Sequence, residues 1–348
     1  MRVQRLQTVD AMIAFDFECP TSAGGTRLAP DVTEEEVRLL ARAMTYKFAS
    51  LEVRVGGAKA AIRARPESRA EAVRSYCDEI RPLVEQGTFL TATDLGTFPE
   101  DFASLPSSDA ADLMHEPVDG MPFDAFITGL GVVVAAETAL GGPGSLEGRT
   151  LALEGFGKIG GATARALEAR GGRLVAVSTV HGCALDPGGF TADGLLALRE
   201  GHGDRLVEDL GVPVRPAAAV FEAEADVLVP GARTGVLDEA TAGRVRASVV
   251  APAANVPYTA GGLAALRARG VLALADFVCN AGATVGYLSP DGLGQAGVLE
   301  RVEGRIRQLT ETALRHPEGP YAGACAFADA HLRTWLAPEQ LPDGPPLA

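Results

Sequence analysis

The chain has 348 residues, more than a single hydrophobic core usually supports, so two domains are expected. Its 47% hydrophobic and 22% charged residues are typical of a soluble globular protein. Asp and Glu number 45 against 31 Lys and Arg, and the net charge of −14 argues against nucleic acid or an anionic membrane surface as a partner. No apolar stretch approaches the ~20 residues that span a membrane, so no membrane association is expected.

Cysteine and histidine usage favours a reducing cytoplasm and argues against a bound metal. The five cysteines are scattered and never spaced as CxxC, which excludes a disulfide scaffold and a thiolate zinc site. The five histidines are equally dispersed. No charged-then-apolar leader opens the chain. We therefore expect a cytoplasmic protein without a metal site.

The N-terminal third is expected to mix strands and helices. A Pro/Ser/Gly segment ends in Gly24-Gly25-Thr26-Arg27, and Thr33 opens a capping box for the helix that carries Lys47. Asp94 stands just beyond a short strand. The expected elements are, in order, a strand at 11–15, a helix from about 34 to beyond 47, a strand at 51–55 that stops before Lys59, a helix at 67–84 and a strand at 88–93.

From about residue 126 the pattern alternates strand and helix, which is typical of a parallel sheet covered on both faces. The expected strands are 150–154, 174–178, 227–229, 248–251 and 271–275, and an amphipathic helix follows at 298–314. We therefore predict an α/β protein of two domains, a mixed substrate-binding and catalytic domain at 1–125 and a Rossmann-type dinucleotide-binding domain at 126–315. A C-terminal helix at 316–348 is expected to return to the first domain and to end in a frayed tail.

A glycine-rich loop follows the strand at 150–154 and opens a helix, the context of the dinucleotide fingerprint. Its first glycine permits a tight turn, its second lets the backbone approach a pyrophosphate, and its third lets helix and strand pack closely. The loop residues are Gly155, Phe156, Gly157, Lys158, Ile159 and Gly160. No acidic residue ends the next strand, where Ser178 and Thr179 stand instead, and no Arg follows at once. NAD and NADP both remain open, with NAD weakly favoured.

Lysine is rare, and its positions suggest function. Of the 31 basic residues 28 are Arg, and the three lysines are Lys47, Lys59 and Lys158. Only an amine titrates readily, so a lysine in so Arg-rich a chain is a candidate functional residue; chance survival is the alternative. An amine near an apolar cleft has a lowered pKa and polarises a carbonyl, while a carboxylate such as Asp94 shuttles a proton.

These motifs resemble the glutamate/leucine/phenylalanine/valine dehydrogenases, and in particular their short-chain leucine, phenylalanine and valine members. The resemblance runs from about Gly24 to Gly286 in one order. It includes MTYK ending at Lys47, GGAK ending at Lys59, TDLGT around Asp94, Thr128-Gly129, the glycine loop, AANVP from Ala253 and DFVCNAG from Asp276. Seven such blocks in order are very specific.

The resemblance implies a role for each matched residue. Lys47 and the Gly25 backbone bind the substrate α-carboxylate, Asp94 takes a proton from the ammonium group, and Lys59 activates water. Thr128, Ala254 and Asn255 face the nicotinamide and its ribose, and Asn280 faces the substrate. The printed chain has 23 residues before Gly24, so we expect the family's N-terminal helix to be missing or shortened and its oligomeric state not to transfer.

Three positions depart from the glutamate-specific pattern. Ala23 stands where glutamate enzymes place a lysine for the side-chain carboxylate, and Tyr287 stands where they have a serine. Thr284 replaces a residue that is usually aliphatic, so Thr284 and Tyr287 either pack or read the substrate side chain. A buried glutamate side chain without its cation costs several kcal/mol, so glutamate is not expected.

The sequence thus predicts an NAD(P)-dependent dehydrogenase that oxidatively deaminates an apolar or non-standard L-amino acid and runs the reverse amination. Its partners would be the amino acid, the 2-oxo acid and ammonia, and a homo-oligomer of two or more subunits is expected. Two alternatives are an ammonia-independent reductase of a C=O or C=N substrate and a non-catalytic nucleotide or amino acid sensor.

Overall fold

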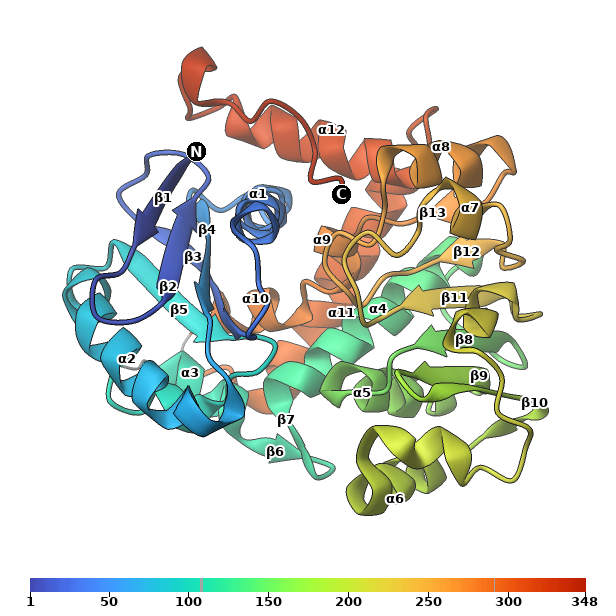
Figure 1. Cartoon of the computed structure of the whole chain (residues 1–348). Helices are drawn as coiled ribbons and strands as arrows, with labels where there is room; N and C mark the ends of the chain where they lie inside the picture. The colour runs from blue at the N-terminus through green and yellow to red at the C-terminus, as the bar shows by residue number, and fades with distance from the viewer. Residues whose placement is uncertain (107–108, 291) are drawn as a thin grey trace. The chain divides into compact units, whose positions relative to one another are not determined.

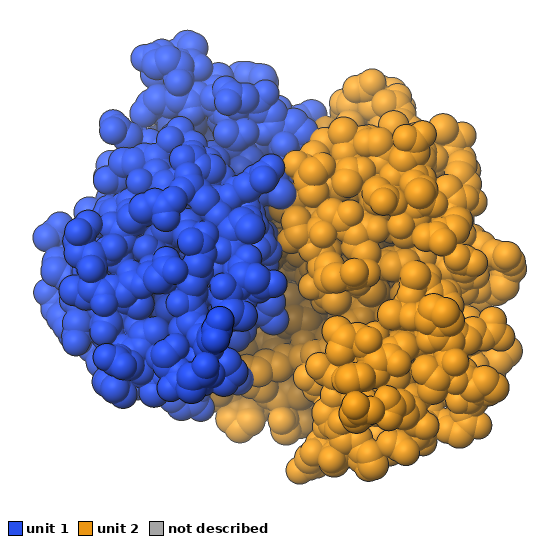
Figure 2. All heavy atoms as spheres, viewed as in Figure 1, with its two compact units in different colours: residues 1–112, 325–346 blue, residues 113–324, 347–348 orange. Residues whose placement is uncertain are grey.

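The computed structural model of the chain describes residues 1–106, 109–290 and 292–348. The chain divides into two compact units, which Figure 2 draws in blue and orange. Unit 1 consists of Met1–Asp112 and Cys325–Pro346, and unit 2 consists of Leu113–Ala324 and Leu347–Ala348. Each unit has its own sheet and is described by itself (Figure 1).

Unit 1 is built on a mixed sheet in the order β1-β2-β4-β3-β5. β1 and β2 pair antiparallel with their neighbours, whereas β4, β3 and β5 run parallel. The strands are β1 (Arg2–Arg5), β2 (Ala11–Phe15), β3 (Ser22–Leu28), β4 (Gly56–Ile62) and β5 (Phe89–Thr93). The helices are α1 (Glu34–Ser50), α2 (Arg69–Glu85), most of α12 (Pro320–Leu332) and the 3-10 turns Pro66–Ser68, Pro99–Phe102 and Pro338–Gln340.

α1 and α2 cover opposite faces of this sheet (Figure 1). Val37 and Ala41 of α1 pack on Met12, Ala14 and Ala61. The residues that alternate with these along the same strands belong to the core beneath α2, because successive side chains of a strand point to opposite faces of the sheet. The predicted cap of α1 is confirmed, because the Glu36 N–H donates to Thr33 Oγ1.

The strand predicted at 51–55 is wrong, because these residues close α1 and lead into β4. Glu52 has a φ of +61°, and β4 begins only at Gly56. The glycine pair lies inside the strand because neighbours come too close for a side chain. A Cβ on Gly57 would lie 2.2 Å from the Ala41 carbonyl oxygen and 2.3 Å from the Thr45 nitrogen. Gly57 therefore lets α1 lie directly on β4.

Replacing Gly57 with Ala is expected to destabilise unit 1 by about 3 kcal/mol, since α1 has to move off β4 to admit one methyl group. A thermal unfolding midpoint followed by circular dichroism measures this. Gly344→Ala is the matched control in the same unit, because no atom lies within 4 Å of a Cβ built there. Equal midpoints for the two variants would contradict the close approach of α1 and β4.

Unit 2 is a doubly wound sheet in the order β10-β9-β8-β11-β12-β13, in which β10 pairs antiparallel with β9 and the remaining pairs are parallel. Its strands are β8 (Thr150–Glu154), β9 (Arg173–Thr179), β10 (Gly182–Phe190), β11 (Val227–Pro230), β12 (Val249–Val250) and β13 (Leu272–Ala273). A separate hairpin joins β6 (Pro117–Val118) and β7 (Met121–Pro122). The sequence predicted every strand of the parallel part and missed β10.

Helices flank this sheet. They are α3 (Asp109–His115), which begins in unit 1, α4 (Phe123–Leu140), α5 (Lys158–Glu168), α6 (Ala192–His202), α7 (Glu239–Ala242), α8 (Ala260–Ala268), α9 (Asp276–Cys279), α10 (Gly282–Tyr287) and α11 (Gly294–Leu314), with 3-10 turns at Gly203–Glu208 and Ala217–Glu222.

α4 is the most apolar helix and lies in the core of unit 2. Its 18 residues, with a mean hydropathy of 1.6, make it long and apolar enough to cross a membrane by length and composition alone. The helix is 78% buried and packs against α5, α10 and α11, and a core helix of a soluble protein passes the same test.

Candidate active site

A buried lysine and a carboxylate meet at the end of the unit 1 sheet. Lys59 lies in the middle of β4, and Asp94 directly follows β5. Lys59 Nζ is 2.8 Å from Asp94 Oδ2, and the two side chains are only 4% and 17% exposed. The sequence singled out both residues, and the fold brings them into contact.

The turn after β5 holds Asp94 in place. The Asp94 N–H donates to Thr97 Oγ1 over 2.9 Å, and this hydroxyl donates to the Thr26 carbonyl oxygen over 2.8 Å. Gly96 has a φ of +79°, and a Cβ there would lie 2.1 Å from the Leu28 carbonyl oxygen. The TDLGT segment therefore ties the carboxylate to β3.

Arg27 also contacts Asp94, and sequence reasoning missed it. Arg27 Nε donates to Asp94 Oδ2 over 3.0 Å, and its guanidinium pairs with Glu36 at the start of α1. β3 and β5 pair Thr26 with Thr93, so the next residues, Arg27 and Asp94, lie side by side. Only the register of these parallel strands reveals the contact.

The pKa values of both residues are lowered, that of Lys59 mainly by burial and that of Asp94 by neighbouring charges. Burial, the largest influence, lowers the pKa of the Lys59 amine, and Arg27 adds to this while Asp94 opposes it. Burial by itself would raise the pKa of Asp94, but the charges of Lys59 and Arg27 hold that pKa well below its usual range. Asp94 is therefore ionised, and Lys59 releases its proton more easily than an exposed lysine.

The Gly25 backbone lies close to the pair. A Cβ on Gly25 would lie 2.9 Å from the Thr93 carbonyl oxygen, 3.1 Å from Asp94 Cβ and 3.4 Å from Lys59 Nζ. Lys47 is buried in the last turn of α1, the helix that packs on β4. Unit 1 thus contains all four residues for which the sequence predicted catalysis or carboxylate binding.

In unit 2 the glycine loop makes a tight turn between β8 and α5, as the sequence predicted. Gly155 turns the chain with a φ of +85°, and a Cβ on Gly160 would lie 2.7 Å from the Gly155 carbonyl oxygen. No atom lies within 4 Å of a Cβ built on Gly157, which precedes α5 and gives this helix no side-chain cap. An open glycine before uncapped N–H groups fits a pyrophosphate. Phe156, Lys158 and Ile159 complete the loop.

Ser178 and Thr179 are buried at the end of β9, and the Ser178 carbonyl oxygen accepts from the Gly155 N–H. Beside them the fold brings two charged groups that the sequence did not place there. Thr179 Oγ1 donates to the Asp204 carbonyl oxygen over 2.6 Å, and Asp204 pairs with Arg199. An acid and an arginine therefore lie near the glycine loop after all.

The two asparagines predicted to face coenzyme and substrate contact each other. Asn280 Nδ2 donates to Asn255 Oδ1 over 3.0 Å and to the Ala253 carbonyl oxygen over 3.1 Å, next to Ala254. Asn280 is buried, and its Oδ1 has no hydrogen-bond partner among the described residues. Such an acceptor is suited to a donor on a ligand.

Thr128 joins α4 to α10, and their packing places Asp124 beside Tyr287. The Ala283 N–H donates to Thr128 Oγ1 over 3.3 Å. A Cβ on Gly282 or Gly286 would touch Ile127, and one on Gly131 would touch Cys279. Later residues of α4 thus meet earlier residues of the segment 279–286, so this segment runs antiparallel to α4. Asp124 precedes Thr128 by one turn, and Tyr287 follows Ala283 by one turn.

The Asp124 carboxylate acts on Tyr287, in the Thr284–Tyr287 region, by its charge. Burial raises the pKa of Tyr287, with Asp124 contributing, and burial likewise raises the pKa of Asp124. Asp124 Oδ1 accepts from the Ala125 N–H, and His115 and Lys158 act on Asp124 by charge and oppose the rise of its pKa. Sequence reasoning missed this residue, since its place depends on the packing of two helices.

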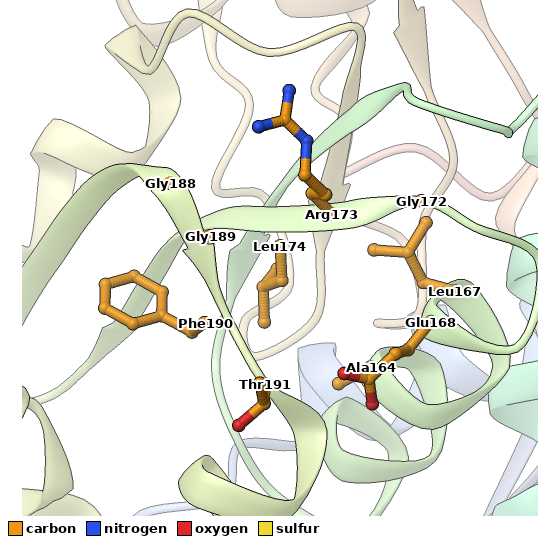
Figure 3. Close-up of a pocket in the computed structure, with 10 residues that line it drawn as sticks. All are labelled: Ala164, Leu167, Glu168, Gly172, Arg173, Leu174, Gly188, Gly189, Phe190 and Thr191. Atoms are coloured by element: carbon orange, nitrogen blue, oxygen red, sulfur yellow. The ribbon is translucent and has the colours of Figure 1, made fainter.

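A small surface pocket of ~120 Å³ in unit 2 lies away from these residues (Figure 3). Arg173, Gly189 and Thr191 help to line it, at the amino end of β9, whereas ligands of doubly wound sheets bind at the carboxyl ends. Within the described residues, no three His, Cys, Asp or Glu side chains are grouped as a metal site requires.

A buried Lys–Asp pair in one unit and a dinucleotide loop on a doubly wound sheet in the other define a two-domain dehydrogenase. The comparisons with known proteins agree. The sequence model of the glutamate/leucine/phenylalanine/valine dehydrogenase family matches residues 120–289. The sequence model of the dimerisation domain of these enzymes matches residues 6–107. The chain belongs to this family and is an NAD(P)-dependent amino acid dehydrogenase.

Relatives in sequence are named glutamate dehydrogenases. An NADP-dependent enzyme of Pyrobaculum calidifontis is 32% identical over 75% of this chain and 67% of its own length. An NAD-specific enzyme of Staphylococcus aureus is 31% identical over 83% of this chain and 74% of its own length.

Solved structures share the fold. A hetero-hexameric glutamate dehydrogenase of Thermus thermophilus matches with a TM-score of 0.80 at 24% identity, over 97% of this chain and 90% of its own. An L-tryptophan dehydrogenase of Nostoc punctiforme matches with a TM-score of 0.62 at 22% identity, over 96% of this chain and 95% of its own. The two-domain fold expected from the sequence is confirmed.

Proposed function

We propose that this protein oxidatively deaminates an L-amino acid other than glutamate, with an apolar or non-standard side chain, to a 2-oxo acid and ammonia, and catalyses the reverse amination. The observation that carries the proposal is the buried contact of Lys59 with Asp94, against which the Gly25 backbone packs closely. Unit 1 would bind substrate and carry the catalytic residues, and unit 2 would bind the coenzyme.

The residues of unit 1 support a two-stage reaction. Lys47 would hold the α-carboxylate with the Gly25 backbone, and Asp94, already ionised, would take a proton from the substrate ammonium group. Bound NAD(P)+ supplies a hydride acceptor for the hydrogen on Cα, which converts the amine to an imine. Lys59, with its lowered pKa, would then take a proton from water as the water attacks the imine carbon, and ammonia leaves.

Charge argues against glutamate, although the sequence relatives carry that name. Ala23 offers no cation where the glutamate enzymes place a lysine. Asp124 adds a carboxylate beside Tyr287, a like charge for the γ-carboxylate of glutamate that His115 and Lys158 offset in part. An unpaired buried carboxylate costs several kcal/mol, which corresponds to a preference of about a hundredfold or more.

Coenzyme reduction with a panel of L-amino acids tests the proposal. We expect kcat/KM for glutamate to be about a hundredfold below that of the best substrate among leucine, valine, phenylalanine, tryptophan and their hydroxylated analogues. Ala23→Lys should raise the glutamate value selectively, and Gly344→Ala should leave the panel unchanged. Glutamate as the best substrate of the unmodified protein would refute the specificity. No coenzyme reduction with release of ammonia for any member would refute the reaction.

We further propose that the protein is a homo-oligomer and that it is cytoplasmic. The matched N-terminal model is described as a dimerisation domain, which supports a homo-oligomer of two or more subunits. All five cysteines are free thiols, which is consistent with a cytoplasmic enzyme.

A further inference from the structure

The end of β9 lacks the acidic residue that holds the adenosine ribose in many dinucleotide-binding sheets. Ser178 and Thr179 stand there, and neither carries a charge to accept from the ribose hydroxyls. A sheet of this kind still requires a polar group between the end of its second strand and the glycine loop.

A later segment supplies such a group. α6 ends at His202, and Gly203, with a φ of +57°, turns the chain back towards β9. The Asp204 carbonyl oxygen then accepts from Thr179 Oγ1 over 2.6 Å. This hydrogen bond fixes Asp204 at the end of β9, although 25 residues separate the two in sequence.

An arginine links Asp204 to the glycine loop. Arg199 Nη1 donates to Asp204 Oδ1 over 3.0 Å, and the same nitrogen donates to the Phe156 carbonyl oxygen. Because one nitrogen contacts both groups, the Asp204 carboxylate lies near the glycine loop, while the Asp204 backbone is bound to the end of β9. Its side chain is 53% exposed and Arg199 is 33% exposed, so a ligand has access to both.

We propose that Asp204, held by Arg199 and Thr179, binds the adenosine ribose and selects NAD over NADP. The inference rests on the proposed function only in that unit 2 binds a nicotinamide dinucleotide. The acid that is missing at the end of β9 is then supplied by the turn after α6.

The charges decide the direction of the preference. The Arg199–Asp204 pair is neutral as a unit, and its carboxylate keeps lone pairs for a ribose hydroxyl. The 2′-phosphate of NADP would bring a charge of about −2 against the same carboxylate. Arg199 attracts that phosphate, but its Nη1 is already bound to Asp204 and Phe156. The carboxylate is therefore the discriminating group.

Two variants test the proposal with opposite expected effects. Isothermal titration with NAD+ and NADP+, without amino acid, measures both dissociation constants for the full chain. Asp204→Asn removes the repulsion and frees Arg199, and should shift the NAD-to-NADP affinity ratio towards NADP by about tenfold or more. Arg199→Gln leaves Asp204 uncompensated, and should shift the same ratio towards NAD.

Asp209→Asn is the matched control, since Asp209 lies in the same segment but pairs with His202. It should leave the ratio unchanged. Tighter binding of NADP+ than NAD+ by the unmodified protein would overturn the proposal, and so would an unchanged ratio in Asp204→Asn. Because binding is measured without amino acid, a failure of the proposed deamination would not affect this result. Loss of both coenzymes in both variants would show a structural role and would also overturn it.

Discussion

Lys59→Ala is expected to lower kcat for amino acid oxidation by about a thousandfold, because it removes the group that would activate water. The side chain is buried and its amine lies 2.8 Å from Asp94 Oδ2, where an alanine leaves no titrating group. Asp94 keeps its contact with Arg27, which limits the structural damage. Coenzyme reduction at saturating substrate measures kcat, and titration with coenzyme reports on unit 2 independently.

Lys59→Arg separates two roles of this lysine. An arginine retains the positive charge beside Asp94, but it does not release a proton in the working pH range. If Lys59 acts by proton transfer, the Arg variant should be nearly as slow as the Ala variant. Recovery of kcat to within tenfold of the unmodified protein by Arg would show that only the charge matters. Unchanged kcat in Lys59→Ala would remove Lys59 from the reaction.

Local sequence patterns predicted those parts of the fold in which a strand and the loop after it are formed by adjacent residues. The strand at 150–154, the glycine loop and the start of α5 form one continuous motif, and the structure has them as expected. Asp94 after β5 was predicted for the same reason. In both places a strand and the turn after it follow one another directly in the sequence.

Glycine-rich strands were the main failure. Ser22–Leu28 and Gly56–Ile62 contain glycine pairs, and a glycine pair normally indicates a turn. Here the glycines serve close packing, since a Cβ on Gly24 would lie 1.7 Å from the Ala58 carbonyl oxygen. The need for that space arises only when the neighbouring strand is in place, so the isolated sequence does not show it.

The missed site residues share another physical cause. Arg27 meets Asp94 through the register of two parallel strands, and Asp204 reaches β9 through the turn at Gly203. Each contact joins residues at least 25 positions apart, so no local spacing indicates it. Lys59 and Asp94 are also more than 25 positions apart in sequence. They were predicted because each of them lies in a family motif of its own.

Arg27→Gln is expected to slow oxidation about tenfold near neutral pH and to move the rising limb of the kcat/KM profile to higher pH. The limb rises as Lys59 loses its proton, because only the neutral amine accepts a proton from water. The Arg27 charge disfavours protonated Lys59 and so lowers its pKa. Removing that charge raises the pKa of Lys59, and a larger share of the enzyme is then protonated and inactive at neutral pH.

Glu36→Gln should move the same limb the other way. The Glu36 carboxylate favours protonated Lys59 and raises its pKa, so its loss lowers that pKa and shifts the limb to lower pH. Arg27→Lys, which keeps the charge, should restore most of the original profile. Steady-state rates between about pH 6 and 10 at saturating coenzyme give all three profiles. This range ends just below the ordinary pKa of lysine. A merely structural role for Arg27 would lower the rate at every pH equally and leave the limb in place. Opposite displacements for the Gln variants at 27 and 36 require an electrostatic effect on Lys59, because a loss of packing does not change sign with the charge that is removed.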